Sequence, residues 1–271
     1  MTQSEVINLE IPAYKFKFDE SIAESYADIV LCTALDIGEH LLKNGAEVSR
    51  VEDTIERICF AYGAAHVESF AITTLIVASV RMKDGEFSEQ MRHVKDSAMN
   101  LYRVEKLNNI SRQICRDHIP VAQAREQIEK YKRSKPYPEV IQILGQVLVV
   151  FGFTLFFGGN WLDSAAASVI ALIVALVSKI DLPFNKGNMQ VIVRSFIAGA
   201  LSELSVNIGV AQNLDCVLIG TIMMLIPGLA LGTAVYDMFN GNLISGMMRA
   251  LQCLVVAIFI AFGYAAAMWL V

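Results

Sequence analysis

Hydrophobic positions follow different patterns in the two halves of the chain. Up to about Pro138, apolar residues recur at helical or strand-like spacing among many Lys, Arg, Asp and Glu side chains. From Val140 to Val271 the chain is mostly apolar, in runs close to the length of about 20 residues that a bilayer-spanning helix needs. The pattern predicts a soluble domain over residues 1–138 and a transmembrane domain over residues 139–271.

Two amphipathic helices are predicted at the start of the soluble domain. In the first, Ser21 and Glu24 form a candidate capping box, and Asn44-Gly45 ends the helix. The second places apolar residues on one face from Val48 to Tyr62. Both helices are expected to pack that face against a core.

Strands and two further helices are predicted next, which makes the domain α+β. The β-branched run Val67–Met82 is too short to span a bilayer, so it predicts one or two strands. Asp84-Gly85 is a hairpin signal and is followed by a short strand over 87–91. Ser97 is expected to cap a third helix, and Pro120 to start a fourth.

The second half predicts an all-α bundle of five transmembrane helices. The apolar runs lie at 140–157, 161–178, 189–210, 214–236 and 243–270. Lysines and arginines lie on one side of these runs, at 132–135, in the connection 179–188 and at Arg249. Because positive charge favours the cytoplasmic side, the soluble domain is predicted to be cytoplasmic and the C-terminus outside the inner membrane.

Composition narrows the classes of function. The net charge is -5 and is spread along the chain, so no nucleic-acid partner is expected. The five cysteines show no CxxC spacing and the four histidines no zinc spacing, which indicates reduced thiols and no metal site. No phosphate loop, dinucleotide fingerprint or nucleophile elbow occurs. We therefore expect no cofactor and no enzymatic activity, and the N-terminal sequence indicates no cleavable signal peptide.

Pro227-Gly228 interrupts the fourth apolar run. Proline lacks the backbone N–H that a helix interior uses, and glycine loosens the backbone further. The simpler interpretation is a kink that membrane helices tolerate. The functional interpretation is a broken helix that helps to form a substrate site, as in many transporters.

Glu203 is the main candidate for proton coupling, because a carboxylate within a span is costly and is expected to face the protein interior or water. Ser195, Gly199, Glu203 and Asn207 recur every four residues and, with Ser202, form one polar stripe on the third run. The stripe predicts either a substrate pathway or a seam between helices. The pathway hypothesis places Glu203 and Gly228 on one shared cavity.

Asp237 and Arg249 flank the turn Phe239–Asn242 between the last two runs. Their opposite charges predict an ion pair at the cytoplasmic face. A structural role is the simpler interpretation, and a role in gating is the alternative.

Several segments, spread over nearly the whole chain, carry a resemblance. They are Leu41–Glu47, Val51-Glu52, Val67–Ser69, Lys83–Gly85, Met224–Leu231, Ala234–Met238, Gly241–Gly246 and Arg249. In this order they resemble the threonine/serine exporter family. Single-chain members of that family have more spans than are predicted here, so the chain resembles the split form, whose other subunit is a small membrane protein.

The resemblance implies a transporter rather than an enzyme. Some split-form members are linked to succinate export, so the implied substrate is threonine and serine or a dicarboxylate. Family members often have an asparagine shortly after Pro-Gly, and Gly232-Thr233 occupy that place here, so Thr233 joins Pro227 and Gly228 as a pathway candidate.

Three functions are therefore compared. The first is an exporter subunit in the lipid bilayer, with a small partner subunit or as a homo-oligomer. The second is a regulatory or assembly subunit, and the third a membrane-anchored hydrolase.

Overall fold

The N-terminal half of the chain combines four helices with one small sheet. The computed structural model describes residues 25–95, 97–134, 137–179 and 189–270. The N-terminal half, residues 25–134, contains α1 (Tyr26–Lys43), α2 (Val48–Ala61), β1 (Ala64–Ile72), β2 (Leu75–Met82), β3 (Phe87–His93), α3 (Leu101–Asp117) and α4 (Val121–Arg133). This arrangement confirms the predicted order of helices and strands.

The three strands form an antiparallel sheet in the order β1-β2-β3. Alternation along β2 turns Ile76, Ala78 and Val80 toward the core, where α1 and α2 cover that face of the sheet. The Asp84-Gly85 turn joins β2 to β3, and Gly85 has a φ of +96°, which explains the glycine there. The run Val67–Met82 is therefore two strands, and the hairpin prediction is confirmed.

Helix caps differ from those expected. The predicted capping box at Ser21 and Glu24 lies outside the described residues, and α1 begins after Ser25, whose side chain accepts a hydrogen bond from Asp28 N. The prediction that Ser97 caps α3 is wrong. Asn100 takes that position, and its Oδ1 accepts a hydrogen bond from Arg103 N at 3.1 Å.

The backbone around Ser97 explains this difference. Ala98 N donates to Lys43 O at 2.9 Å, and Asn100 N donates to Asn44 O at 3.0 Å, so residues 98–100 are held against the end of α1. Helical turns can begin only after these long-range bonds, which moves the cap from Ser97 to Asn100.

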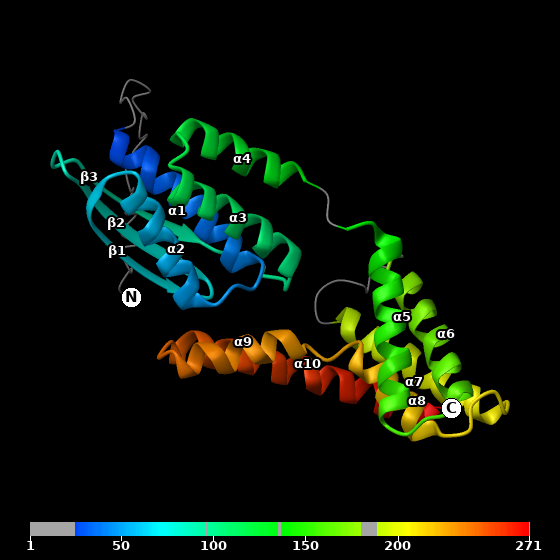
Figure 1. Ribbon diagram of the computed structural model, residues 1–271. Coiled ribbons are helices and arrows are strands. Elements are labelled where there is room, and N and C mark those ends of the chain that lie inside the picture. The colour runs from blue at the N-terminus through cyan, green and yellow to red at the C-terminus, as the bar shows by residue number, and fades with distance from the viewer. Residues whose placement is uncertain (1–24, 96, 135–136, 180–188, 271) are drawn as a thin grey trace, which may run out of the picture.

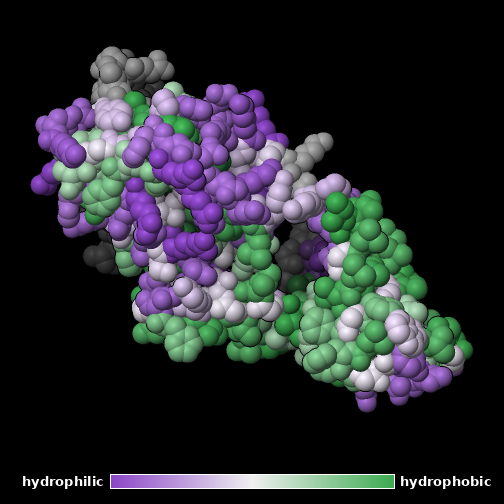
Figure 2. Space-filling model, viewed as in Figure 1, coloured by the Kyte–Doolittle hydropathy of each residue, from purple (hydrophilic) through white to green (hydrophobic). Residues whose placement is uncertain are grey.

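The apolar half, residues 137–270, contains helices only. They are α5 (Glu139–Phe156), α6 (Trp161–Val177), α7 (Met189–Asn207), α8 (Leu214–Met223), α9 (Gly228–Phe239) and α10 (Leu243–Leu270). It has its own buried core, separate from the core of the N-terminal half. Figure 2 shows the matching difference at the surface, which is mostly hydrophilic over the N-terminal half and hydrophobic over α5–α10.

The count of five spanning helices is not confirmed. Among the described residues, α5, α7 and α10 are long and apolar enough to cross a membrane, and α8 with α9 makes a fourth if the bent pair is one span. The remaining helix, α6, is apolar but has only 17 residues. The structure thus supports a membrane protein with three or four candidate spans.

Helix α7 packs closely against α10 through small residues. At Gly199, an added Cβ would lie 2.9 Å from Ala267 Cβ, and at Gly263 it would lie 2.0 Å from Ser195 Oγ and 2.6 Å from Ile192 O. Such close approach is typical of small residues at helix seams in membranes. Ser195 and Gly199 therefore belong to this seam.

Gly263→Ala is expected to lower the free energy of unfolding by about 1–3 kcal/mol, as overpacking typically does. A serine side chain can rotate, but the Ile192 carbonyl moves only if α7 and α10 separate. The matched control is Gly232→Ala in α9, where an added Cβ meets nothing within 4 Å. Thermal unfolding in detergent compares the two, and equal midpoints would contradict the close packing.

Helices α9 and α10 of the apolar half contact the N-terminal half. Figure 1 shows α9 and the first part of α10 running beneath the N-terminal half, while α5–α8 gather with the end of α10 at the other side. Helix α8 is followed by a break, and α9 continues at 59° to it. This bend directs α9 toward the N-terminal half, where the candidate site lies.

Candidate functional site at the junction of the two halves

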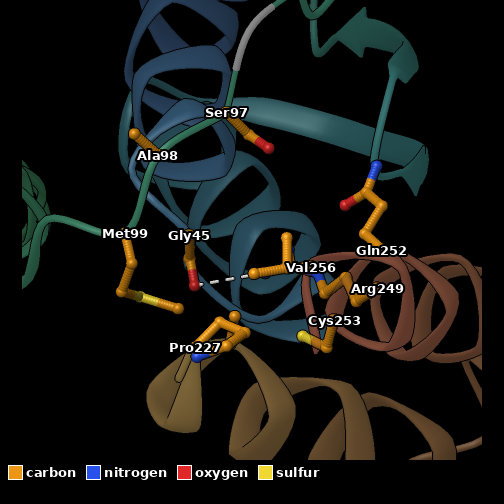
Figure 3. A pocket seen from close by; sticks show the side chains of 10 residues that line it. Gly45, Ser97, Ala98, Met99, Pro227, Arg249, Gln252, Cys253 and Val256 are labelled. Atoms are coloured by element: carbon orange, nitrogen blue, oxygen red, sulfur yellow. Dashed lines mark hydrogen bonds between the residues drawn. The ribbon is translucent and has the colours of Figure 1, made fainter. Parts of the chain in front are cut away.

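A cavity of about 160 Å³ lies where the break between α8 and α9 meets the N-terminal half. Its apolar-half lining is Pro227, Ala230, Arg249, Gln252, Cys253 and Val256, and its other wall is Gly45, Ser97, Ala98 and Met99. Figure 3 shows Ser97 and Gln252 on opposite sides of the view, with Pro227 below them. We call this space the junction cavity.

A wider cleft of about 650 Å³ adjoins the junction cavity. The two share Ser97, Gln252 and Val256, and the cleft adds Thr73 and Thr74 from the β1–β2 turn. The N-terminal half therefore contributes polar groups to a space that reaches the break.

The break has the local chemistry that the sequence predicted. Pro227 precedes α9, and no side chain caps that end of the helix. Gly228 N bonds only back to Ile226 O, at 2.9 Å, which is a tight turn rather than helix. The first N–H groups of a helix lack intrahelical partners, so the start of α9 is a region of positive potential beside Pro227 and Ala230.

A buried ion pair joins α9 to α10 next to this cavity. Gly241, with a φ of +87°, turns the chain between the helices, and this places Asp237 against Arg249. Arg249 Nε lies 3.2 Å from Asp237 Oδ2, in an ionic contact without hydrogen-bond geometry. Asp237 is 0% exposed and Arg249 8%. The predicted ion pair is present, and it is buried.

The same two side chains bind the N-terminal half. Asp237 Oδ1 accepts a hydrogen bond from Val48 N, the first residue of α2, at 3.0 Å. Arg249 Nη2 donates to Ala46 O at 2.7 Å, and Nη1 to Gly45 O at 3.4 Å. Together these contacts form a junction clamp between residues 45–48 and the α9–α10 hairpin.

Helix α2 explains why a carboxylate fits there. Its N-cap residue, Glu47, makes no side-chain capping bond, so Asp237 supplies an acceptor from another helix. Nearby, burial raises the pKa of Glu52, and the Asp237 charge raises it further, while the bond from Ala71 N opposes the shift.

The polar stripe of α7 is divided by the fold. Ser195, Gly199 and Ser202 are buried, and both serines donate to backbone carbonyls of their own helix. Glu203 is half-buried, and its Oε2 is enclosed without a hydrogen-bond partner in the described part of the chain. Asn207 is exposed.

The predicted pathway residues of α9 lie near the break without all facing the junction cavity. Pro227 lines the cavity, Gly228 is exposed, and Thr233 Oγ1 donates to Leu229 O at 3.0 Å. The lining of the junction cavity does not include Glu203. The cavity shared by Glu203 and Gly228 stays a prediction.

Sequence reasoning missed the partners of the clamp in the N-terminal half. Gly45 and Ala46 take part through carbonyls and Val48 through its N–H, and every residue except proline has both groups. One signal was available: Leu41–Glu47, Ala234–Met238 and Arg249 all belong to the resemblance, and the structure brings these three together.

Comparison with known proteins assigns the class. The family model described as "Putative threonine/serine exporter" matches residues 33–271, and the chain belongs to this family. It is therefore a multi-pass membrane protein of a transporter family. Its relatives indicate an exporter subunit rather than an enzyme.

Two similar proteins have descriptions that name a solute. The chain is 27% identical over 215 residues to the "Probable succinate transporter subunit YjjP" of Klebsiella aerogenes, covering 78% of this chain and 81% of the relative. It is 26% identical over 221 residues to the protein of the same description from Escherichia coli K12, covering 79% and 84%. No solved structure matches the chain.

Proposed function

We propose that this chain is the larger subunit of a two-component exporter for a small solute that carries a carboxylate, with the junction cavity on its route. The supporting observation is a cavity bounded on one side by a broken helix and on the other by the N-terminal half. Discontinuous helices form the substrate sites of many transporters, because their ends offer unpaired backbone groups.

The charges around the junction cavity favour a carboxylate. The uncapped start of α9 lies at the wall that Pro227 and Ala230 form, and Arg249, which is paired with Asp237, lines another wall. Backbone N–H groups at a helix start bind carboxylates directly. Ser97 and Gln252 add groups that can donate hydrogen bonds to the rest of the solute. Threonine and serine, or a dicarboxylate such as succinate, have this chemistry.

Orientation and membrane follow from the distribution of charge in the sequence. We propose that the N-terminal half lies in the cytoplasm and that the C-terminus lies outside the inner membrane, with α6 and the α8–α9 pair completing five spans. In that orientation the N-terminal half covers the cytoplasmic entrance of the route. The partner is a small membrane protein, in line with relatives described as transporter subunits.

Ala230→Phe is expected to reduce efflux at least tenfold, because a phenyl ring fills much of a cavity of about 160 Å³. Efflux of succinate, threonine and serine is measured in cells that lack the gene and then receive it with its partner. The matched control is Leu231→Phe, which adds the same ring at an exposed position beside it. The solute that accumulates without the gene identifies the substrate.

Normal efflux of every solute by Ala230→Phe would contradict a route through the junction cavity. Full efflux by the partner alone would instead favour the regulatory or assembly role, for which the clamp between the halves provides a structural basis.

A further inference from the structure

A separate cavity of about 240 Å³ lies in the N-terminal half, between α2 and α3. It shares no lining residue with the junction cavity. Its rim consists of Arg50, Asp53 and Arg57 from α2 and Arg112 from α3. All four rim residues are exposed, so the opening faces solvent.

Helical spacing places the rim residues on the faces of α2 and α3 that point toward each other. Residues 50, 53 and 57 lie on one face of α2, and residues 108, 112 and 115 lie on one face of α3. Helices α2 and α3 are packed neighbours, so the two faces enclose the cavity between them. The arginines are therefore held around one space by rigid helices.

The rim carries an excess of positive charge. With three arginines and one aspartate, the rim carries a net charge of +2. Arg57 Nε binds Asp53 Oδ1 at 2.7 Å, so that aspartate is already paired. Among the described residues, the guanidinium groups of Arg50 and Arg112 have no hydrogen bond or ion pair of their own. Two cations at one cavity are thus available to a ligand.

The floor of the cavity is neutral and adds a donor. Thr54 Oγ1 donates to Arg50 O at 2.7 Å and Ser111 Oγ to Asn108 O at 2.9 Å, so both hydroxyl hydrogens are used. The Asn108 carboxamide is half-buried, and its NH₂ group is free to donate within the described structure. Burial raises the pKa of the Cys115 thiol, which keeps it uncharged. Nothing at the floor opposes an anion.

We propose that the cavity between α2 and α3 binds a small metabolite with two negative charges on carboxylate or phosphate oxygens. Guanidinium groups match both kinds of oxygen in bidentate geometry, and a charge of -2 balances the rim. The proposal does not depend on the exporter function. The site lies on the helix whose first N–H holds Asp237, so a bound anion contacts the same helix as the junction clamp.

Isothermal titration calorimetry on the purified full chain in detergent at low salt tests this proposal. Inorganic phosphate and succinate are titrated separately. Arg50→Gln combined with Arg112→Gln is expected to weaken binding at least tenfold, because the charged donors are removed and screening is low. The matched control is Arg116→Gln, an exposed arginine of α3 that pairs with Asp117 outside the cavity. It is expected to bind normally.

A second variant is expected to strengthen anion binding instead of weakening it. Asp53→Asn raises the rim charge from +2 to +3 and releases Arg57, so the anion is expected to bind about threefold tighter. Slower hydrogen exchange in α2 and α3 on adding the ligand locates the site. Binding of phosphate only, or of succinate only, identifies which oxyanion the cavity prefers.

Absence of saturable binding by both anions would overturn the proposal, as would equal affinities of the native chain and the double arginine variant. Ala230→Phe separates this site from the export route. It is expected to leave the binding of phosphate unchanged while it blocks efflux, because Ala230 lines only the other cavity.

Discussion

Asp237→Leu is expected to lower the free energy of unfolding by about 3–5 kcal/mol, the usual cost of breaking a buried ion pair. The variant leaves Arg249 buried without a counter-charge and removes the acceptor of the Val48 N–H. Both losses fall at the junction clamp, so the N-terminal half is also expected to separate more easily from the α9–α10 hairpin. Thermal unfolding in detergent measures the first effect, and proteolysis at the junction measures the second.

A double variant distinguishes charge from packing. Asp237→Leu with Arg249→Met removes both charges and keeps apolar volume, so its cost is expected to be smaller than the sum of the two single variants. The control is Glu139→Gln, which breaks the exposed ion pair with Lys179 and is expected to change the stability much less than either single variant. Additive single costs would contradict a coupled pair.

The clamp also predicts a functional effect. In the proposed exporter, the N-terminal half covers the junction cavity, and residues 45–48 are attached to both helices that border it. If this attachment positions the cover, the double variant folds and yet exports poorly. Normal efflux by a stable double variant would show that the clamp has only a structural role.

Glu203→Gln is expected to abolish proton-driven efflux while the protein accumulates and folds normally. Glu203 lies in α7 with its Oε2 enclosed and, within the described residues, unpartnered. A carboxyl group there can alternate between a charged form, which is costly in this environment, and a neutral form, which is not. Glutamine keeps the shape but cannot release a proton, so coupling is lost.

The measurement is solute efflux at two external pH values, with and without a proton gradient. Asp215→Asn is the matched control, because Asp215 is an exposed carboxylate at the start of α8. It is expected to export normally. Unchanged pH dependence in Glu203→Gln would remove the coupling role and leave Glu203 as a residue of the helix bundle.

Local patterns were sufficient for most elements of the N-terminal half. The period of apolar residues predicted α1 and α2, and Asp84-Gly85 predicted the hairpin, because backbone preference and burial act over a few residues there. The cap of α3 was predicted wrongly, since residues 98–100 bond to the end of α1 far away in the sequence. No local pattern contains that information.

At Pro227-Gly228, too, the sequence predicted one part of the structure and tertiary contacts decided the other. Its existence was predictable, because proline removes a helix hydrogen bond wherever it occurs. The bend of 59° and the direction of α9 depend on its tertiary contacts, which here are its packing against α10 and the hydrogen bond from Val48 N to Asp237. The stripe of α7 was similarly visible in sequence, and only packing assigned Ser195 and Gly199 to the seam with α10.

The sequence by itself determined the two halves, the helix break, the family resemblance and the pairing of Asp237 with Arg249, because each depends on composition or on neighbouring positions. The tertiary structure decided that this pair also holds Gly45, Ala46 and Val48, and that the break opens into a cavity beneath the N-terminal half. Backbone N–H and carbonyl groups are the same in nearly every residue, so their partners become identifiable only when distant segments are brought together.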